Sequence, residues 1–239
     1  MPMRATTIRF SEDLWATLES EAAREGVSVA QLVRDAALIR LGVLAGRRGD
    51  PDAQLTIEQL AERGRRRRAV QAADDDGRLA ALRATGLLDT PPEEAFDRLA
   101  NLARRVVNAP GALISLLNGD SEFLKSSVGL PEPWASSRRL PLSHSFARYP
   151  VADLQPLIVT DAREHPGLRG HAAIEDMGVV AYVGIPLVTA DDRALGALSV
   201  FDSHPRVWTA DQVDLLRDIA GSVMTEIELR TAAATRPQP

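Results

Sequence analysis

One stretch decides the fold of the larger part of this chain: residues 86–99, GLLDTPPEEAFDRL. Thr90, two prolines and Glu93 predict the start of a helix. Threonine is a good N-cap, proline is tolerated in the first turn, and a glutamate three residues after the cap completes a capping box. Apolar side chains then recur on one helical face, at Phe96, Leu99, Ala103 and Val106. The stretch therefore predicts an amphipathic helix that packs against a core.

Short apolar strands follow this helix. Residues 112–117 and 122–128 are separated by the hairpin turn signal Asn118-Gly119,. Further strands are predicted at residues 157–159, 179–188 and 195–201. A long final helix starts near Thr209, with an apolar seam that suits either a short coiled coil or a core-facing helix. The order helix, strands, helical insertion, strands, helix predicts an α+β domain with an antiparallel sheet and flanking helices.

Six phrases in this region resemble the GAF sensor domains of bacterial signalling proteins. They are the opening stretch, FLKSSVGL at residues 123–130, LSHSF at 142–146, VTDAR at 159–163, GIPL at 184–187 and GALSVFD at 196–202. The resemblance covers residues 78–230. It implies that a small molecule binds between the sheet and the helical insertion, and that the first and last helices dimerise.

The resemblance also implies which residues line that ligand pocket. One wall would comprise Ser143, His144, Ser145, Phe146 and Tyr149, and the opposite wall Asp161, Arg163, Tyr182 and Gly184. Two readings stay open for His144, which could ligate haem or could bond to backbone in a helix cap. Asp161 and Arg163 could instead pair with each other.

Related domains often have a cysteine where this chain has Ala147 and Ser199. The absence of cysteine at these two positions counts against covalent bilin attachment, thiol redox sensing and the cysteine-dependent sulfoxide reductase activity of some relatives. The cofactor is therefore unknown, with a small-molecule effector expected in the pocket. No catalytic constellation and no metal site are predicted.

Composition limits the classes of protein further. The 239 residues contain no cysteine, which excludes disulfides and Cys-ligated zinc,. No run approaches 18 apolar residues and no secretory pattern opens the chain, so we expect a cytoplasmic protein without a membrane partner. The net charge of −5 argues against a chain that coats nucleic acid along its whole length,. The Ala- and Arg-rich composition suggests a bacterial source.

The N-terminal segment has a different pattern. Residues 5–14, ATTIRFSEDL, alternate as a short strand and then cap a helix at Ser11,. Gly26 is positioned to end that helix, and Ser28 to cap a second one. So short a module cannot bury an adequate core as a monomer, which predicts an intertwined dimer.

This pattern resembles the ribbon-helix-helix family of bacterial DNA-binding proteins over residues 4–42. The resemblance implies that the strands of two chains pair as an antiparallel ribbon, which enters the major groove of DNA. It assigns base or phosphate contacts to Arg4, Ala5, Thr7 and Arg9, and phosphate contacts to backbone near Val27 and Ser28. A homodimer or higher oligomer is expected. The alternative is a module that only dimerises, because residues 1–42 contain five arginines against six acids.

Together these patterns predict four segments: a ribbon-helix-helix module at 4–42, an Arg-rich linker with a helix at 43–77, a GAF sensor at 78–230 and a disordered tail at 231–239. We expect a transcription regulator in which the sensor modulates DNA binding. The alternative is a non-enzymatic signalling scaffold or antitoxin-like partner-binding protein. Neither would be an enzyme.

Overall fold

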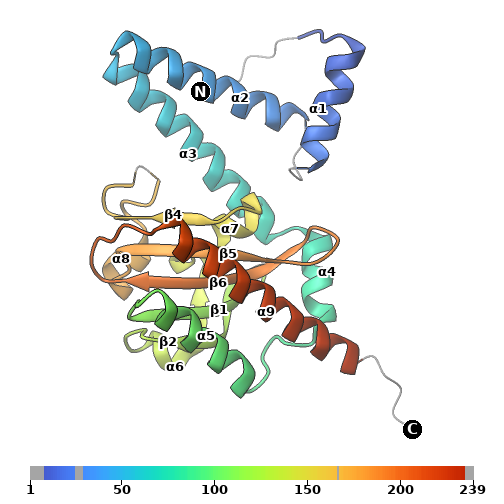
Figure 1. The fold of residues 1–239 in the computed structure, drawn as a ribbon, viewed down its shortest axis with the longest axis vertical. Coiled ribbons are helices and arrows are strands. Elements are labelled where there is room, and N and C mark those ends of the chain that lie inside the picture. The colour runs from blue at the N-terminus through green and yellow to red at the C-terminus, as the bar shows by residue number, and fades with distance from the viewer. Residues whose placement is uncertain (1–7, 25–28, 166, 235–239) are drawn as a thin grey trace. The chain divides into compact units, whose positions relative to one another are not determined.

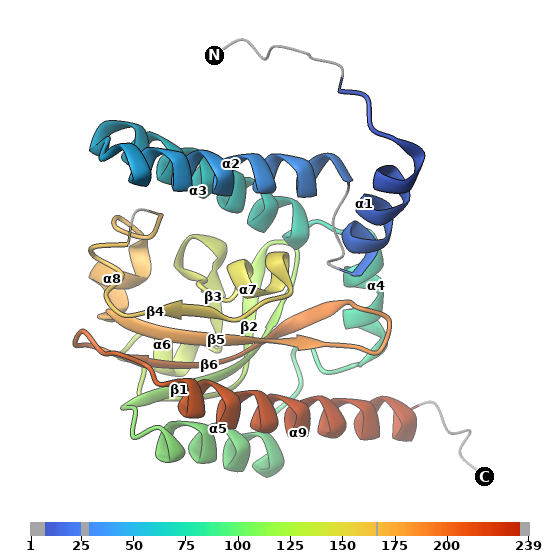
Figure 2. The same cartoon turned by 45° about the horizontal axis from the view of Figure 1, so that its top comes forward.

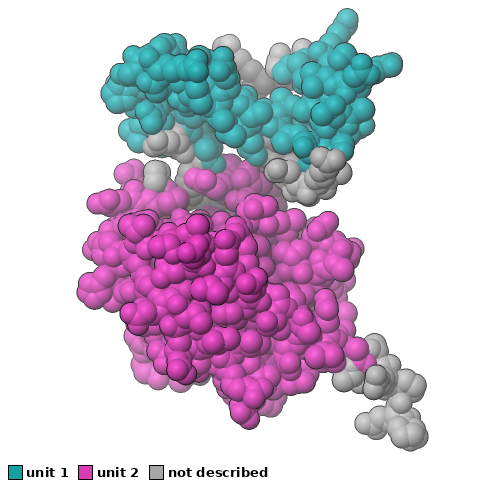
Figure 3. All heavy atoms as spheres, viewed as in Figure 1, with its two compact units in different colours: residues 1–61 teal, residues 62–239 magenta. Residues whose placement is uncertain are grey.

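The computed structural model describes residues 8–24, 29–165 and 167–234. The chain divides into two compact units, residues 1–61 and residues 62–239 (Figure 3). The larger unit contains the sheet and both of its helical layers, and most of the described residues of the smaller unit are helical.

The larger unit is built on one antiparallel sheet (Figure 1). Over the described residues its strand order is β3-β2-β1-β6-β5-β4, and every neighbouring pair runs antiparallel. The strands are β1 (Gly111–Leu117), β2 (Ser121–Val128), β3 (Arg139–Pro141), β4 (Leu157–Val159), β5 (Ala181–Val188) and β6 (Ala194–Asp202). The predicted antiparallel sheet with flanking helices is confirmed, including both hairpins.

Helices cover the two faces of the sheet differently (Figure 2). The long helices α5 (Glu94–Val106) and α9 (Ala210–Ala234) lie side by side on one face. Short helices of the insertion lie on the opposite face; these are α7 (Arg148–Asp153) and α8 (Ala172–Met177). The insertion also contains α6 (Trp134–Ser137) and the 3-10 turn η1 (Leu142–His144). Two large hydrophobic clusters result, one on each face, and a third, smaller cluster includes Leu117 and Val151.

The strand alternation explains the two clusters. Successive side chains of a strand point to opposite faces, so Ile114 and Val183 pack toward α5 and α9 while Leu113 and Tyr182 face the insertion. The apolar seam of α9 is buried in the first cluster and so faces the core of its own chain: Val213, Leu216, Ala220, Val223 and Ile227.

The predicted capping box at Thr90 is wrong, because α5 begins at Glu94. The side chains of Thr90 and Glu93 instead bind the buried ammonium group of Lys125, at 2.6 Å and 2.5 Å. The Pro91 carbonyl accepts a third bond from the same ammonium. A buried cation needs such partners, and this need outweighs the local capping preference.

Arg78 joins the end of α3 (Pro51–Ala73) and the start of α4 (Asp76–Ala84) to the sheet. Its buried guanidinium donates to the carbonyls of Ala72 and Ala73, the last residues of α3, and to Leu117, the last residue of β1. The last carbonyls of a helix have no partner within the helix, so this arginine satisfies two of them.

The smaller unit contains α1 (Glu12–Arg24), α2 (Val29–Arg48) and the first part of α3. The predicted strand lies mostly outside the described residues, and residues 8–10 are not in a strand. The predicted linker is helical over most of its length, since α2 continues to Arg48 and α3 starts at Pro51. The described residues therefore give no evidence for a ribbon-helix-helix module. Of the predicted C-terminal tail, residues 231–234 belong to α9.

Candidate functional site

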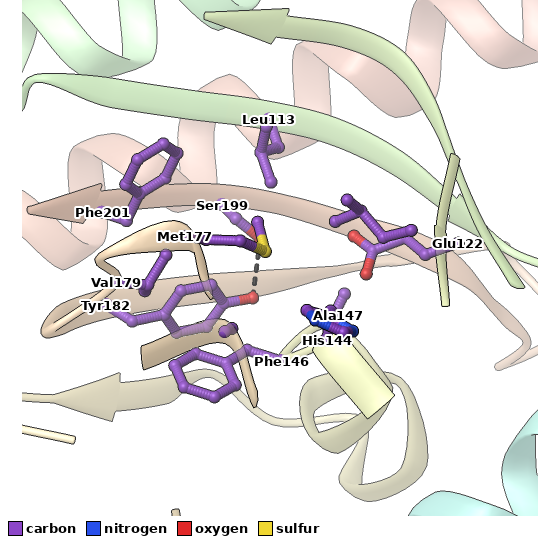
Figure 4. A pocket seen from close by; sticks show the side chains of 12 residues that line it. Leu113, Glu122, His144, Phe146, Ala147, Met177, Val179, Tyr182, Ser199 and Phe201 are labelled. Carbon is purple, nitrogen blue, oxygen red and sulfur yellow. Dashed lines mark hydrogen bonds between the residues drawn. The ribbon is translucent and has the colours of Figure 1, made fainter. Parts of the chain in front are cut away.

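A cavity lies between the sheet and the insertion (Figure 4). The sheet side is formed by β1, β2, β3, β5 and β6, and the other side by η1, α8 and the segments next to them. The space measures about 290 Å³ including its opening to solvent, of which about 20 Å³ is wide enough for the centre of a water molecule. The lining residues are Leu113, Glu122, Leu140, His144, Phe146, Ala147, Ala173, Met177, Val179, Tyr182, Ser199 and Phe201.

Glu122 is the acidic group of this lining. Its side chain comes from β2 and the residue is only 2% exposed. The Oε2 atom has no hydrogen-bond partner among the described residues. Burial raises the pKa of this carboxyl, while hydrogen bonds from the side chains of Ser115 and Ser145 act in the opposite direction. Burial therefore favours the protonated, neutral form of Glu122.

Tyr182 faces Glu122 from β5. Figure 4 shows the Tyr182 hydroxyl and the Glu122 carboxyl both pointing toward the middle of the cavity. The hydroxyl pairs with Ser199 Oγ at 2.7 Å. Burial and the nearby Glu122 carboxyl raise the pKa of Tyr182, so this hydroxyl stays protonated,. A Cβ on Gly184 would come within 2.4 Å of the tyrosine oxygen, so the glycine leaves room for the ring.

His144 lies at the rim of the cavity and connects η1 to α8 within the insertion. Its Nε2 lies 2.8 Å from Asp176 Oδ2 on α8, and its Nδ1 lies 3.0 Å from Ser143 Oγ. The imidazole also packs against Trp134, with 4.6 Å between the ring centroids. Both ring nitrogens are thus engaged within the protein. Neither of the predicted roles, haem ligand or backbone-bonded cap, describes this arrangement.

Some of the predicted pocket residues meet at the cavity and others do not. His144, Phe146 and Tyr182 line it, and Gly184 shapes it through Tyr182. Ser145 is buried, and its hydroxyl accepts a hydrogen bond from the backbone N–H of Arg148. Residues outside the lining are Ser143, which bonds His144, and Tyr149, whose hydroxyl accepts from Arg148.

Asp161 and Arg163 form a pair with each other outside the cavity lining. The guanidinium donates from Nε and Nη2 to the two carboxylate oxygens, at 2.9 Å and 2.6 Å. This interaction lowers the pKa of Asp161. The reading in which the two residues pair is therefore the one that the geometry supports.

Sequence reasoning missed Glu122, although the chain contains a signal for it. Glu122 and Leu124 are two residues apart in one strand and so share a face, and Leu124 belongs to the cluster on the insertion side. An acid at an inward position of a predicted strand marks a buried charge. The contributions of Met177 and Val179 had no such signal, because they depend on how the insertion folds back.

The predicted DNA-contact residues fall mostly outside the described chain. Arg4, Ala5, Thr7, Val27 and Ser28 are among the residues that the structure does not describe. Arg9 is described and its side chain is exposed. DNA as a partner and the homodimer stay predictions.

Comparison with known proteins identifies the larger unit. The profile of the GAF domain family matches residues 91–227, more than half of the chain, and the chain belongs to this family. The GAF domain from a phosphoenolpyruvate-protein phosphotransferase of Coxiella burnetii has the same fold. It is 16% identical, covers 66% of this chain and 97% of its own, and gives a TM-score of 0.51. A corresponding domain from Acinetobacter is 16% identical over 68% of this chain and 99% of its own, with a TM-score of 0.49.

One relative carries a functional name. A protein of Pseudomonas aeruginosa named a cyclic di-GMP phosphodiesterase is 31% identical over 156 residues. The match covers 64% of this chain, but the chain spans only 26% of the relative's length. The family match supports the predicted role in sensing and signal transduction.

The same relative corrects two predictions. The prediction of a DNA-binding transcription regulator is wrong, because the comparisons point to a signalling or enzymatic role. They also count against the alternative of a non-enzymatic scaffold or antitoxin-like partner. The expectation that the chain is not an enzyme is overturned, since the relative is named as one. That expectation relied on the absence of cysteine and of a catalytic constellation, and such an absence does not determine whether a chain belongs to an enzyme.

Within residues 8–24, 29–165 and 167–234, none of the helices combines the length and the hydrophobicity that a membrane span needs. In the same part of the chain, no group of three or more His, Cys, Asp or Glu side chains is arranged to hold a metal ion.

Proposed function

We propose that this chain takes part in cyclic di-GMP signalling, with its GAF domain as the sensory part. The observation that carries the proposal is the 31% identity over 156 residues to the P. aeruginosa phosphodiesterase. The domain senses a small molecule in the cavity between sheet and insertion and thereby changes the rate at which cyclic di-GMP is broken down. Such coupling requires that the ligand prefer one conformation of the domain.

The cavity suits this role because its lining is mostly apolar, with a few polar groups that converge: Glu122, Tyr182, Ser199 and His144. Small-molecule sites typically have this composition. The long helices α5 and α9 contact the other face of the same sheet. A change in the sheet on ligand binding therefore reaches the two helices directly.

The test is genetic. Deletion of the gene in its native host should change the intracellular cyclic di-GMP concentration, measured by mass spectrometry, and a plasmid copy of the full chain should restore it. A matched plasmid with the exposed substitution Asp120→Asn should restore it equally. An unchanged concentration in the deletion strain, under conditions in which the protein is made, would contradict the proposal.

We also propose that the N-terminal helices mediate self-association. In the described part of residues 1–61, the buried apolar residues are Ala22 and Ala45, whereas Leu14, Trp15 and Ile39 are more than 40% exposed. A segment with so small a core needs further apolar contacts. An intertwined dimer of the ribbon-helix-helix type is one arrangement that would bury these side chains.

Light scattering of the purified chain tests this. The full chain should run as a dimer, and a variant with Trp15→Glu and Ile39→Glu should be a monomer. If the full chain is monomeric at micromolar concentration, the proposal is refuted.

A further inference from the structure

The cavity of the GAF domain contains one feature that points to the chemistry of its ligand. Glu122 is almost completely buried and its Oε2 atom has no partner among the described residues. Buried polar atoms nearly always have hydrogen-bond partners in native proteins, so each exception calls for an explanation. Because this residue lines the cavity (Figure 4), a ligand there can donate to the open oxygen.

The other polar groups of the lining already have partners. Tyr182 and Ser199 are bonded to each other, and His144 is bonded to Asp176 and Ser143. Among the side-chain polar atoms of the lining, the Glu122 Oε2 atom is therefore the one that is buried without a hydrogen-bond partner in the described part of the chain. A ligand with one hydrogen-bond donor fits this pattern, because a neutral carboxyl keeps an oxygen that can accept.

The remaining walls determine the shape of the ligand. Three aromatic rings surround the cavity, from Phe146, Tyr182 and Phe201, and Met177 adds a polarisable side chain. Aromatic and thioether side chains favour flat aromatic partners. The ring of Phe146 meets that of Tyr182 edge-on, at 5.2 Å between centroids. A planar ligand can pack against such a wall.

We propose that this cavity binds a small, uncharged, planar aromatic molecule with a single ring N–H, of which indole is the prototype, and that Glu122 recognises it by accepting that N–H at Oε2. The inference rests on the proposed function in taking this cavity as the sensory site. It adds the ligand class and the residue that reads it. Burial, which raises the pKa of Glu122, fits an uncharged ligand, since a neutral carboxyl needs no cation as its partner,.

Entry requires the walls to separate, because only about 20 Å³ of the cavity admits the centre of a water molecule. η1 and α8 lie on the side of the cavity opposite the sheet. The hydrogen bond between His144 and Asp176 joins them at the rim, and the two side chains are 12% and 55% exposed. One hydrogen bond contributes about 1 kcal/mol to stability, which is a small part of the stability of a domain. The rim can therefore open without unfolding the sheet.

The test compares indole with indene, in which the ring N–H is replaced by CH₂ while size and shape are nearly kept. Each is titrated into the purified full chain and followed by protein-detected NMR. Indole should bind about tenfold more tightly than indene, which is the effect of one hydrogen bond. Equal affinities, or no binding of either probe up to its solubility limit, would overturn the proposal.

Variants then assign the preference to Glu122. Glu122→Leu should bind the two probes equally, because the acceptor is gone, while indene binding is retained. Glu122→Gln keeps an acceptor oxygen and should keep a preference for indole. Asp120→Asn, an exposed neighbour, is the matched control and should behave as the wild type. A preference for indole that survives in Glu122→Leu contradicts the assignment. If the leucine variant does not fold, the comparison of probes on the wild type decides the ligand class.

The outcome is separable from that of the proposed function. Failure of both probes to bind leaves the genetic test of cyclic di-GMP signalling unaffected. Selective binding of indole together with an unchanged cyclic di-GMP concentration in the deletion strain would support the proposed ligand site and refute the proposed role in cyclic di-GMP signalling.

Discussion

Replacement of Glu93 by glutamine should destabilise the domain from the side of the sheet opposite the cavity. Glu93 links the buried Lys125 on β2 to Arg230 on α9, with both N–O distances at 2.5 Å. The Lys125 side chain is 1% exposed, that of Glu93 28% and that of Arg230 42%. Glu93→Gln therefore leaves a buried cation with uncharged partners, which are the hydroxyl of Thr90, the carbonyl of Pro91, the Phe96 ring and the new amide.

The size of the effect follows from this geometry. Removal of one partner of a buried ion pair costs about 3–5 kcal/mol. Glu93 is partly exposed and two acceptors remain for Lys125, so we expect a loss of about 2–3 kcal/mol in the free energy of unfolding at pH 7. Arg230→Gln breaks the more exposed half of the network and should cost at most about 1 kcal/mol.

Urea unfolding followed by tryptophan fluorescence measures these losses. The control is Glu94→Gln on the next residue, whose side chain is 86% exposed and 3.9 Å from Arg98, and which should change stability by less than about 0.5 kcal/mol,. The hydrogen bond from Lys125 lowers the pKa of Glu93. Its contribution is therefore present above the unfolded pKa of about 4.3 and is lost as the pH falls through the folded value. If Glu93→Gln and Glu94→Gln cost the same, or if the deficit persists in acid, this reasoning is refuted.

Three more perturbations test other parts of the structure. Glu122→Gln should stabilise the domain most at neutral pH. Burial raises the pKa of Glu122, so the wild-type domain gains stability as the pH falls toward about 4.3, and the stability advantage of the variant becomes smaller,. Melting temperatures at pH 5 and pH 8 measure this difference, and an advantage that does not depend on pH would contradict it. Arg78→Lys should lower the free energy of unfolding by about 2–4 kcal/mol, because one ammonium group cannot replace a buried guanidinium that donates to three carbonyls,. Urea unfolding measures this loss. An unchanged free energy of unfolding would show that these hydrogen bonds at the end of α3 do not contribute to stability. Gly184→Ala should displace the Tyr182 ring and cost about 1–3 kcal/mol,; a crystal structure of the variant with the hydroxyl still on Ser199 would disprove the close contact.

The sheet was predictable because each strand carries its own local signal. Residues 112–117 and 122–128 are apolar runs around a turn dipeptide, and each observed strand begins one residue earlier and ends at the same residue,. The start of α5 was not predictable, since Thr90 and Glu93 are engaged by Lys125, more than 30 residues away in sequence. Local capping rules contain no information about such a long-range partner.

The cavity was predictable in outline and not in its chemistry. His144 and Phe146 of the LSHSF phrase line the cavity, whereas Asp161 and Arg163 pair with each other outside it. Glu122 has a local signal, as an acid at an inward position of a strand, but its place in the cavity depends on the insertion that folds over it. In the N-terminal segment, the alternation of residues 5–10 favoured a strand, but no partner strand is present in the described part of the chain to test it.

The most direct test of the signalling role is a domain exchange. Residues 78–230 replace the matched segment of the P. aeruginosa phosphodiesterase, and hydrolysis of cyclic di-GMP is measured with the purified chimera. We expect a rate within about tenfold of that of the natural enzyme, because coupling between domains typically amounts to about 5–150-fold and an equivalent GAF domain preserves it. An unrelated folded domain of the same length serves as the control. A chimera no more active than this control would contradict the claim that the GAF domain of this chain works in cyclic di-GMP turnover.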